Sequence, residues 1–282
     1  MQVNPFRWYH PGLPKRIPGR HFARNLIERR TLIFQLVKRD FQQRYVGSAA
    51  GWLWGLIHPL VLLGVYTYIF NICMGTVPSP GAGTRSYSLY LFAGMLPWLL
   101  FAETVTRSSS SIVEQANLVT KTMFPSEILP VSIFLSSLAS HLLTVVLFVV
   151  IAGIAEGHRS PMILLLPVFW LLVGMFAVGI GWIAASLQVY LRDTAQVVAV
   201  VMTLWLWVTP IMIPEDKIPA RLRFVLVANP LVYIVRAYRS MLLGSASPLL
   251  RDMAVAAAFA TVTFVLGGLF FRHMKRGFAD VL

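Results

Sequence analysis

Six stretches of this 282-residue chain contain no Asp, Glu, Lys or Arg, and each approaches or exceeds the length that a helix needs to cross a lipid bilayer. Soluble proteins carry roughly 25% charged residues, whereas this chain carries 12%. We therefore predict an all-α polytopic membrane protein with six transmembrane helices. The runs are Val46–Thr84 (with its apolar centre at Trp52–Met74), Ser86–Ala102, Ile128–Ala155, Ser160–Leu191, Thr194–Pro214 and Met253–Phe271.

The distribution of basic residues predicts the topology. The chain has 24 Lys and Arg against 11 Asp and Glu, and many of the basic residues lie before the first run or after Phe271. Basic ends and an even number of crossings place both termini in the cytoplasm. A protein that binds nucleic acid would need a polar exterior, so we expect a membrane surface rather than nucleic acid to attract this charge. The prediction is one transmembrane domain over 1–282, with a cytoplasmic tail and interface helix at 1–45, a bundle at 52–271 and a cytoplasmic tail at 272–282.

The segment between the fifth and sixth runs departs from this charge rule, because it is predicted to lie outside and yet is basic. Within it, Phe224–Val235 is apolar but only 12 residues long, and Asn229–Pro230 interrupts it. We expect two short helices that either re-enter the membrane from outside or lie flat at its interface. Arg236 and Arg239 are one helical turn apart, so they either face a phosphate or lipid headgroup together or extend to the interface.

The segment Phe22–Tyr45 has the pattern of an amphipathic helix that lies on the inner leaflet. Its basic side either anchors the chain generally or attracts an anionic lipid or a lipid-linked pyrophosphate, with Arg39 and Arg44 as the candidate residues. The apolar stripe consists of Phe22, Leu26, Ile33, Val37, Phe41 and Tyr45.

The chain has no evident energy source of its own. The phosphate-binding pattern GxxxxGK[ST] is absent, and no Gly-Lys dipeptide occurs anywhere. Ion-coupled transporters place charged residues inside their spans, whereas these runs contain no Asp, Glu, Lys or Arg and their candidate proton-binding residues are His58 and His141. A histidine on a packed helix is more often a hydrogen-bonded interior residue than a proton relay. If the protein transports, we expect another chain to supply the energy.

The predicted inner loop Glu103–Glu127 is too long for a tight turn and leads into the sequence NLVTKTMFPSEILP at Asn117–Pro130. We expect a short amphipathic helix there, with Met123 and Phe124 as an apolar knob. Such a helix suits docking into a groove on a partner protein, and the alternative is a surface helix that rests on its own bundle.

Catalysis has little support in the residues. A membrane-embedded glycosyltransferase needs acidic residues for a metal ion or a general base. The adjacent pair Glu215 and Asp216 is predicted to lie outside, where nucleotide donors are absent, and Asp193 is flanked by Arg192. We predict no catalytic residue and no metal site. A scaffold without transport activity remains an alternative, but it gives the inner helix no role.

Five pieces of the chain, in order, resemble the type 2 ATP-binding-cassette exporter permeases of bacterial polysaccharide export. Together they extend over nearly the whole chain, and their combination is more specific than any one of them. They are RDFQQRYVGSAAGWLWGLIHPL at 39–60, LVTKTMFPSEILP at 118–130, YLRDT at 190–194, ANPL at 228–231 and FADVL at 278–282.

This resemblance implies a homodimeric permease in the bacterial inner membrane, served by two copies of a cytoplasmic ATPase. ATP and Mg would be bound by the ATPase, and this chain would bind no cofactor. It implies that 118–130 is the coupling helix, that the turn at 190–194 makes a second ATPase contact, and that 214–244 lies near the outer gate. The implied coupling residues are Asn117, Lys121, Met123, Phe124, Pro125, Glu127, Arg192 and Asp193.

The implied cargo is a lipid-linked, O-antigen-like polysaccharide, with capsule, teichoic acid, a drug or a small lipid as alternatives. Sugar rings pack their C–H faces on aromatic side chains, and the first two runs are rich in aromatic residues. We expect part of this set to line a conduit, and the alternative is that they belong to the interfacial belt or to helix packing. The set is Trp52, Trp54, Tyr66, Phe70, Trp98 and Phe101.

Overall fold

The computed structural model describes residues 29–44, 46–47, 51–121, 124–157, 160–245 and 249–282. Within these ranges the chain is built from helices, as predicted, and five of them are long and apolar enough to cross a membrane. They are α3 (Trp54–Tyr66) with the π-helical η2 (Thr67–Cys73), α4 (Tyr87–Glu114), α6 (Ile128–Glu156), η3 (Pro161–Leu165) with α7 (Leu166–Tyr190), and α11 (Leu249–Met274).

The fifth predicted span forms a shorter apolar helix, α8 (Thr194–Val208), of 15 residues. At about 1.5 Å per residue it is ~22 Å long, less than the ~30 Å of a bilayer core. The helix ends where it does because Pro210 disfavours a helical backbone at Thr209, whose ψ is 133°. The fold class is therefore confirmed, with five full-length spans and a shorter helix at the fifth of the six predicted spans.

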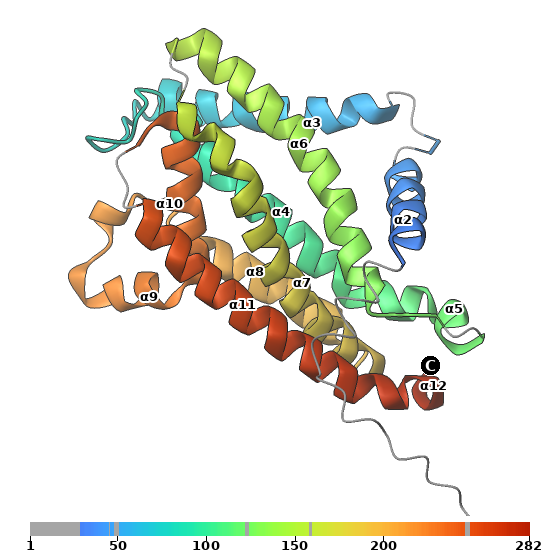
Figure 1. The fold of residues 1–282 in the computed structure, drawn as a ribbon. Helices are drawn as coiled ribbons and strands as arrows, with labels where there is room; N and C mark the ends of the chain where they lie inside the picture. Colours follow the sequence, from blue (N-terminus) through green and yellow to red (C-terminus); the bar gives the residue numbers. More distant parts are fainter. Residues whose placement is uncertain (1–28, 45, 48–50, 122–123, 158–159, 246–248) are drawn as a thin grey trace, which may run out of the picture.

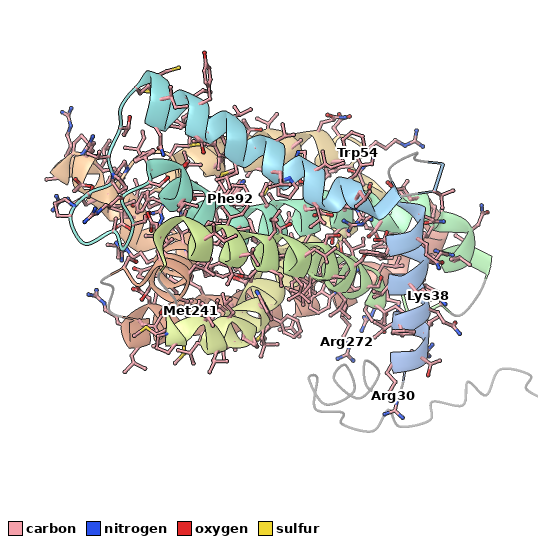
Figure 2. The ribbon with its side chains drawn as sticks, turned by 90° about the horizontal axis from the view of Figure 1, so that it is seen from above. Arg30, Lys38, Trp54, Phe92, Met241 and Arg272 are labelled. Atoms are coloured by element: carbon pink, nitrogen blue, oxygen red, sulfur yellow. The ribbon has the colours of Figure 1, made fainter. Side chains whose placement is uncertain are left out.

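The two ends of the bundle differ in what they carry. Figure 1 shows α2 (Arg30–Gln43), α5 (Ala116–Lys121) and α12 (Phe278–Val281) at one end, which we call the α5 end. The segment 74–86 and α9 (Arg223–Ala228) lie at the opposite end, which we call the α9 end. Arg30, Lys38 and Arg272 all lie toward the α5 end (Figure 2). The basic residues of α2 and the basic end of α11 therefore share one end of the molecule.

The helix α2 lies across the end of the bundle and packs on α6 (Figure 1). Ile33 and Leu36 are buried and Val37 and Phe41 are half-buried, whereas Phe34 on the other side is 68% exposed. The predicted apolar stripe is confirmed for Ile33, Val37 and Phe41. Its members Phe22, Leu26 and Tyr45 lie outside the described residues.

The helix α4 runs through the middle of the bundle, where its first half is almost entirely buried against α6, α7 and α10 (Pro230–Leu243). It continues to Glu114, so the first half of the predicted inner loop Glu103–Glu127 belongs to α4, which corrects that expectation. The second half of α4 contains several serine and threonine residues. They fit a helix because their hydroxyl groups donate hydrogen bonds to backbone carbonyls one turn earlier. Thr104 Oγ1 donates to the Leu100 carbonyl at 2.7 Å, and Ser111 Oγ to the Ser108 carbonyl at 2.7 Å.

The predicted break at Asn229–Pro230 is confirmed, since α9 ends at Ala228 and α10 begins at Pro230. Asn229 caps α10 by accepting a hydrogen bond from the Leu231 N–H at 3.1 Å, and Pro230 occupies the first turn, where its missing N–H costs nothing. Nearly every residue of α10 is buried against α4 and α11. This packing favours the re-entrant interpretation for α10 over a helix lying flat on the surface.

Candidate functional site

The coupling segment at the α5 end is shorter and more irregular than predicted. The helix α5 stops at Lys121, residues 124–127 are not helical, and Pro130 already lies in the first turn of α6. Asn117 is exposed and Phe124 is half-buried against the core. Met123 and the side chain of Lys121 lie outside the described residues. The exposed side of α5 is thus the part of the segment that is free to meet a partner.

Glu127 and Pro125, two predicted coupling residues, are buried rather than presented outward. The carboxylate of Glu127 forms an ion pair with Lys275 near the end of the chain. Its backbone carbonyl accepts a hydrogen bond from Trp182 Nε1 at 3.0 Å. The expectation that Glu127 itself contacts a partner is corrected, because these bonds direct it toward its own bundle.

The turn between α7 and α8 presents Arg192 and Asp193 as exposed side chains. Gln188 holds the turn together: its side-chain amide donates to the Arg192 carbonyl at 2.8 Å and accepts from the Ala195 N–H at 2.6 Å. Both residues are therefore available for a second contact with a partner, and that role stays a prediction.

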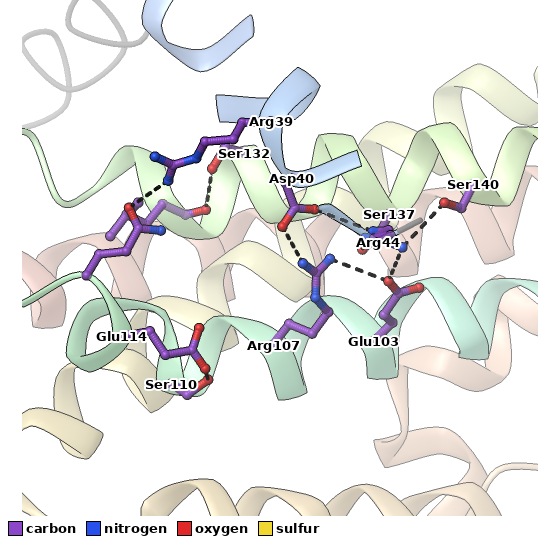
Figure 3. Close-up of polar contacts among 12 residues, drawn as sticks. Arg39, Asp40, Arg44, Glu103, Arg107, Ser110, Glu114, Ser132, Ser137 and Ser140 are labelled. Atoms are coloured by element: carbon purple, nitrogen blue, oxygen red, sulfur yellow. Dashed lines mark hydrogen bonds and ion pairs between the residues drawn. The ribbon is translucent and has the colours of Figure 1, made fainter. Parts of the chain in front are cut away.

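A cluster of four charged residues joins α2 to α4 near the α5 end (Figure 3). Arg44 contacts Glu103 at 2.6 Å and Asp40 at 3.4 Å, and Arg107 contacts Asp40 and, at 3.5 Å, Glu103. Each carboxylate thus meets both guanidinium groups. Burial raises the pKa of Asp40, but its hydrogen bond to Arg107 and the charges of Arg107 and Arg44 outweigh this effect and lower the pKa below its usual value. Asp40 therefore stays ionised at neutral pH.

Sequence reasoning missed this cluster although a signal was present. Asp40 and Arg44 are four residues apart on one helix, as are Glu103 and Arg107 on another, and acid–base pairs at that spacing share a helix face. The missing information was that the two helices bring these pairs together.

Arg44 also borders a cavity of about 410 Å³ between α3, α4 and α6. Its guanidinium donates to Ser137 Oγ at 3.1 Å and to Ser140 Oγ at 3.3 Å. Other polar side chains of the lining are Glu103, His58, His141 and Thr144, and the remainder includes Trp54, Leu62, Leu96 and Leu99. The cavity combines a cation and hydroxyl groups with an apolar wall, which suits an amphiphilic ligand.

Arg39 borders a second cavity, of about 400 Å³, between α2, α6 and the junction of α4 with α5. Its Nη2 donates to Gln115 Oε1 at 3.4 Å in an exposed contact. The two candidate arginines of α2 therefore face different cavities and do not form one site.

The expectation that Arg239 faces lipid is wrong. Its side chain is 3% exposed, and its guanidinium donates to the carbonyls of Tyr90 at 3.2 Å, Pro210 at 2.9 Å and Ile211 at 3.0 Å. The Tyr90 ring lies 3.7 Å from the Arg239 Cζ atom. Arg239 thus fastens α10 to α4 and to the end of α8.

Arg236 is also engaged inside the protein, where its Nε donates to Glu215 at 2.7 Å and 3.0 Å. The carboxylate of Asp252 on α11 is fully buried, 3.9 Å from Arg236 Nη1. The predicted headgroup contact is therefore not supported for Arg236, which links the segment after α8 to α10 and α11.

Two of the predicted conduit aromatics belong to the core. Phe101 is fully buried, stacked on Phe176 at 5.1 Å with Trp205 edge-on at 5.4 Å. Trp98 is buried beside Phe101 at 5.9 Å. Neither side chain reaches the surface of the chain, which corrects the expectation and favours the packing alternative for both.

The other conduit aromatics are more accessible. Tyr66 and Phe70 are half-buried with ring centroids 6.4 Å apart, and Phe70 contacts Tyr87 at 5.3 Å. Trp54 is 52% exposed and borders the Arg44 cavity. The side chain of Trp52 lies outside the described residues. Trp54, Tyr66 and Phe70 remain candidates for cargo contact.

In its described residues the chain is thus a multi-pass, all-helical protein with a short helix, α5, between its second and third long spans. The chain belongs to the ABC-2 type transporter family, whose sequence profile matches residues 31–243. Membership implies a transport permease that works with an ATP-binding-cassette ATPase rather than an enzyme.

Several relatives are similar over most of their length. The O-antigen export system permease protein RfbA of Myxococcus xanthus is 28% identical over 262 residues, which cover 92% of this chain and 98% of that protein. The RfbA protein of Klebsiella pneumoniae is 27% identical, with 89% and 95% covered. The polysialic acid transport protein KpsM of Escherichia coli is 23% identical, with 82% and 89% covered.

Proposed function

We propose that this chain is the transmembrane subunit of an ATP-driven exporter that moves a lipid-linked, O-antigen-like polysaccharide outward across the bacterial inner membrane. The observation that carries the proposal is the similarity to O-antigen export permeases, which extends over 98% of the length of one relative. The similarity to a polysialic acid transport protein is lower, which favours an O-antigen-like cargo over a capsule-like one. Teichoic acid, a drug or a small lipid stay as alternatives without a supporting observation.

The proposed assembly is a homodimer with two copies of a cytoplasmic ATPase, which bind ATP and Mg in place of this chain. The α5 end faces the cytoplasm in this proposal, so both termini are cytoplasmic. Its support is the collection of basic residues at that end, where positive charge marks the cytoplasmic side. ATP-driven movement of the ATPase would reach the spans through α5, which joins α4 to the segment before α6.

Arg44 is the proposed contact for the phosphate of the lipid carrier. Its cavity offers a guanidinium and two serine hydroxyls beside apolar side chains, and arginine binds phosphate oxygens in a bidentate manner. A phosphate there would compete with Glu103 for Arg44. Arg39 is the proposed contact for an anionic headgroup, because it borders the second cavity and its hydrogen bond to Gln115 is exposed.

Removal of this gene from its host tests the proposed function. Surface polysaccharide is expected to disappear while lipid-linked glycan accumulates inside the cells, because synthesis continues without export. The wild-type gene restores the surface polymer, whereas Arg44→Lys, which keeps the charge but loses the two-pronged contact, restores it only in part. Normal surface polysaccharide without internal glycan would contradict the proposed cargo.

A further inference from the structure

Two of the five sequence pieces that carry the family resemblance, YLRDT at 190–194 and FADVL at 278–282, meet at the α5 end. Phe278 is 1% exposed, and its ring contacts Phe271 at 5.6 Å and Tyr190 at 6.2 Å. The Tyr190 hydroxyl donates to the Met274 carbonyl at 2.9 Å. The end of the chain is therefore folded back and fastened to the end of α7.

The same terminal segment reaches the coupling segment. Lys275, in the turn η6 (Lys275–Gly277) before α12, forms the ion pair with Glu127, and α12 lies beside α5 (Figure 1). The Glu127 carbonyl is held by Trp182 of α7, so Glu127 connects the start of α6 both to α7 and to the terminal segment. Residues from α7 and η6 thus converge on the segment 124–127, which leads into α6.

The helix α5 needs such outside support. It has six residues, and a helix of fewer than about 12 residues is only marginally stable in water without packing. Val119 of α5 and Phe124, which follows α5, pack against the hydrophobic core. Leu282, after α12, packs against the same core. The contacts around α5 are therefore part of what determines its position.

We propose that the terminal segment Lys275–Leu282 is a brace that holds α5 and residues 124–127 in the position in which they meet the ATPase. The proposal rests on the proposed coupling role of α5. Lys275, Glu127 and Tyr190 act here as positioning residues, because they set the place of the contact surface without forming it. Because this segment directly follows α11, a movement of α5 would also be transmitted to α11, the last span.

Charge reversal at the ion pair tests the brace. The probe is the ATP-binding-cassette ATPase that copurifies with the tagged wild-type chain, and the measurements are its affinity for the purified permease and the permease-dependent ATP hydrolysis. Glu127→Lys or Lys275→Glu alone is expected to weaken ATPase binding about tenfold, because each places two like charges together where one side chain, that of residue 127, is buried. The double variant, which restores an opposite pair, is expected to return to within about threefold of wild type.

Two further variants separate the brace from folding and from general charge effects. Arg276→Glu makes the same change of charge as Lys275→Glu at the exposed neighbouring residue, and Glu127→Lys is not expected to correct any loss that it causes. Tyr190→Phe removes only the hydroxyl bond to Met274, so it is expected to weaken binding about threefold while the chain inserts and unfolds like the wild type.

The results distinguish failure of the brace from failure of the proposed function. Asn117→Trp enlarges the exposed side of α5 without touching the ion pair, and it is expected to abolish ATPase binding. If Asn117→Trp abolishes binding but the single reversals do not weaken it, or if the double variant stays as weak as the single ones, the brace is refuted. If Asn117→Trp leaves binding intact, the coupling role of α5 fails, and the brace fails with it.

Discussion

Replacing Arg239 by methionine is expected to destabilise the protein by about 3–5 kcal/mol, because the variant removes a buried charged donor while its acceptors stay buried. The carbonyls of Pro210 and Ile211 follow the end of α8, where the helix no longer supplies N–H donors, and both accept from Arg239. Gly94 leaves room for this side chain, since a Cβ atom there would lie 2.7 Å from Arg239 Nη2. Thermal unfolding of the purified protein in detergent measures the loss.

Arg236→Met is the matched control for that variant. Arg236 lies one turn earlier on α10, is 29% exposed, and is held mainly by the partly exposed Glu215. Water can replace part of its contact with Glu215, and its contact with the buried Asp252 is long at 3.9 Å, so the expected loss is about 1–2 kcal/mol. Equal losses for the two variants, or an Arg239→Met protein as stable as the wild type, would contradict the role assigned to Arg239.

Gly267→Ala is expected to destabilise the packing of α7 on α11 by about 3 kcal/mol, at the upper end for overpacking, because the obstacle is backbone. A Cβ atom at Gly267 would overlap the Gly179 carbonyl oxygen, and one at Gly179 would lie 2.6 Å from the Thr263 carbonyl oxygen. Small residues at such crossings let membrane helices approach closely. The measurement is again the unfolding temperature in detergent.

The neighbouring Gly268 provides the control for the crossing. A Cβ atom there would meet only the Trp182 ring, at 3.6 Å, which is an ordinary contact distance. Gly268→Ala is therefore expected to stay within about 0.5 kcal/mol of wild type. If both alanine variants were equally stable, α7 and α11 could not be as close as described.

The membrane-crossing elements could largely be predicted from sequence because uncharged runs are a direct consequence of burial in lipid. The residues at which these elements begin and end could not be predicted in the same way. The helix α4 extends to Glu114 through a serine-rich stretch whose hydroxyls bond within the helix, so its polarity resembled that of a loop. The shortening of α8 had a visible cause in Pro210, but prolines inside membrane helices are often tolerated, as Pro97 is in α4.

The site residues were harder to predict because spacing shows which side chains share a face and not what that face meets. Arg236 and Arg239 lie on one helix turn, yet Arg239 is enclosed by carbonyls and Arg236 by carboxylates. Phe101 was predicted to line a conduit because it is aromatic. An aromatic ring is equally suited to packing in a core, and Phe101 stacks on Phe176 there. Glu127 lies in the coupling segment, but its partner Lys275 is 148 residues away in sequence.

The central claim is that α5 lies on the cytoplasmic side and transmits movement of a bound ATPase to the spans. Cysteine labelling tests this claim most directly. The native chain has a single cysteine, the exposed Cys73, which is the last residue of the first span. A Cys73→Ser/Asn117→Cys variant moves this label site to the exposed side of α5. A membrane-impermeant maleimide is expected to label Cys73 of the native chain only in right-side-out vesicles. It should label the variant only in inverted vesicles, and less when the ATPase is bound. Labelling of the variant in right-side-out vesicles would place α5 outside and contradict the account.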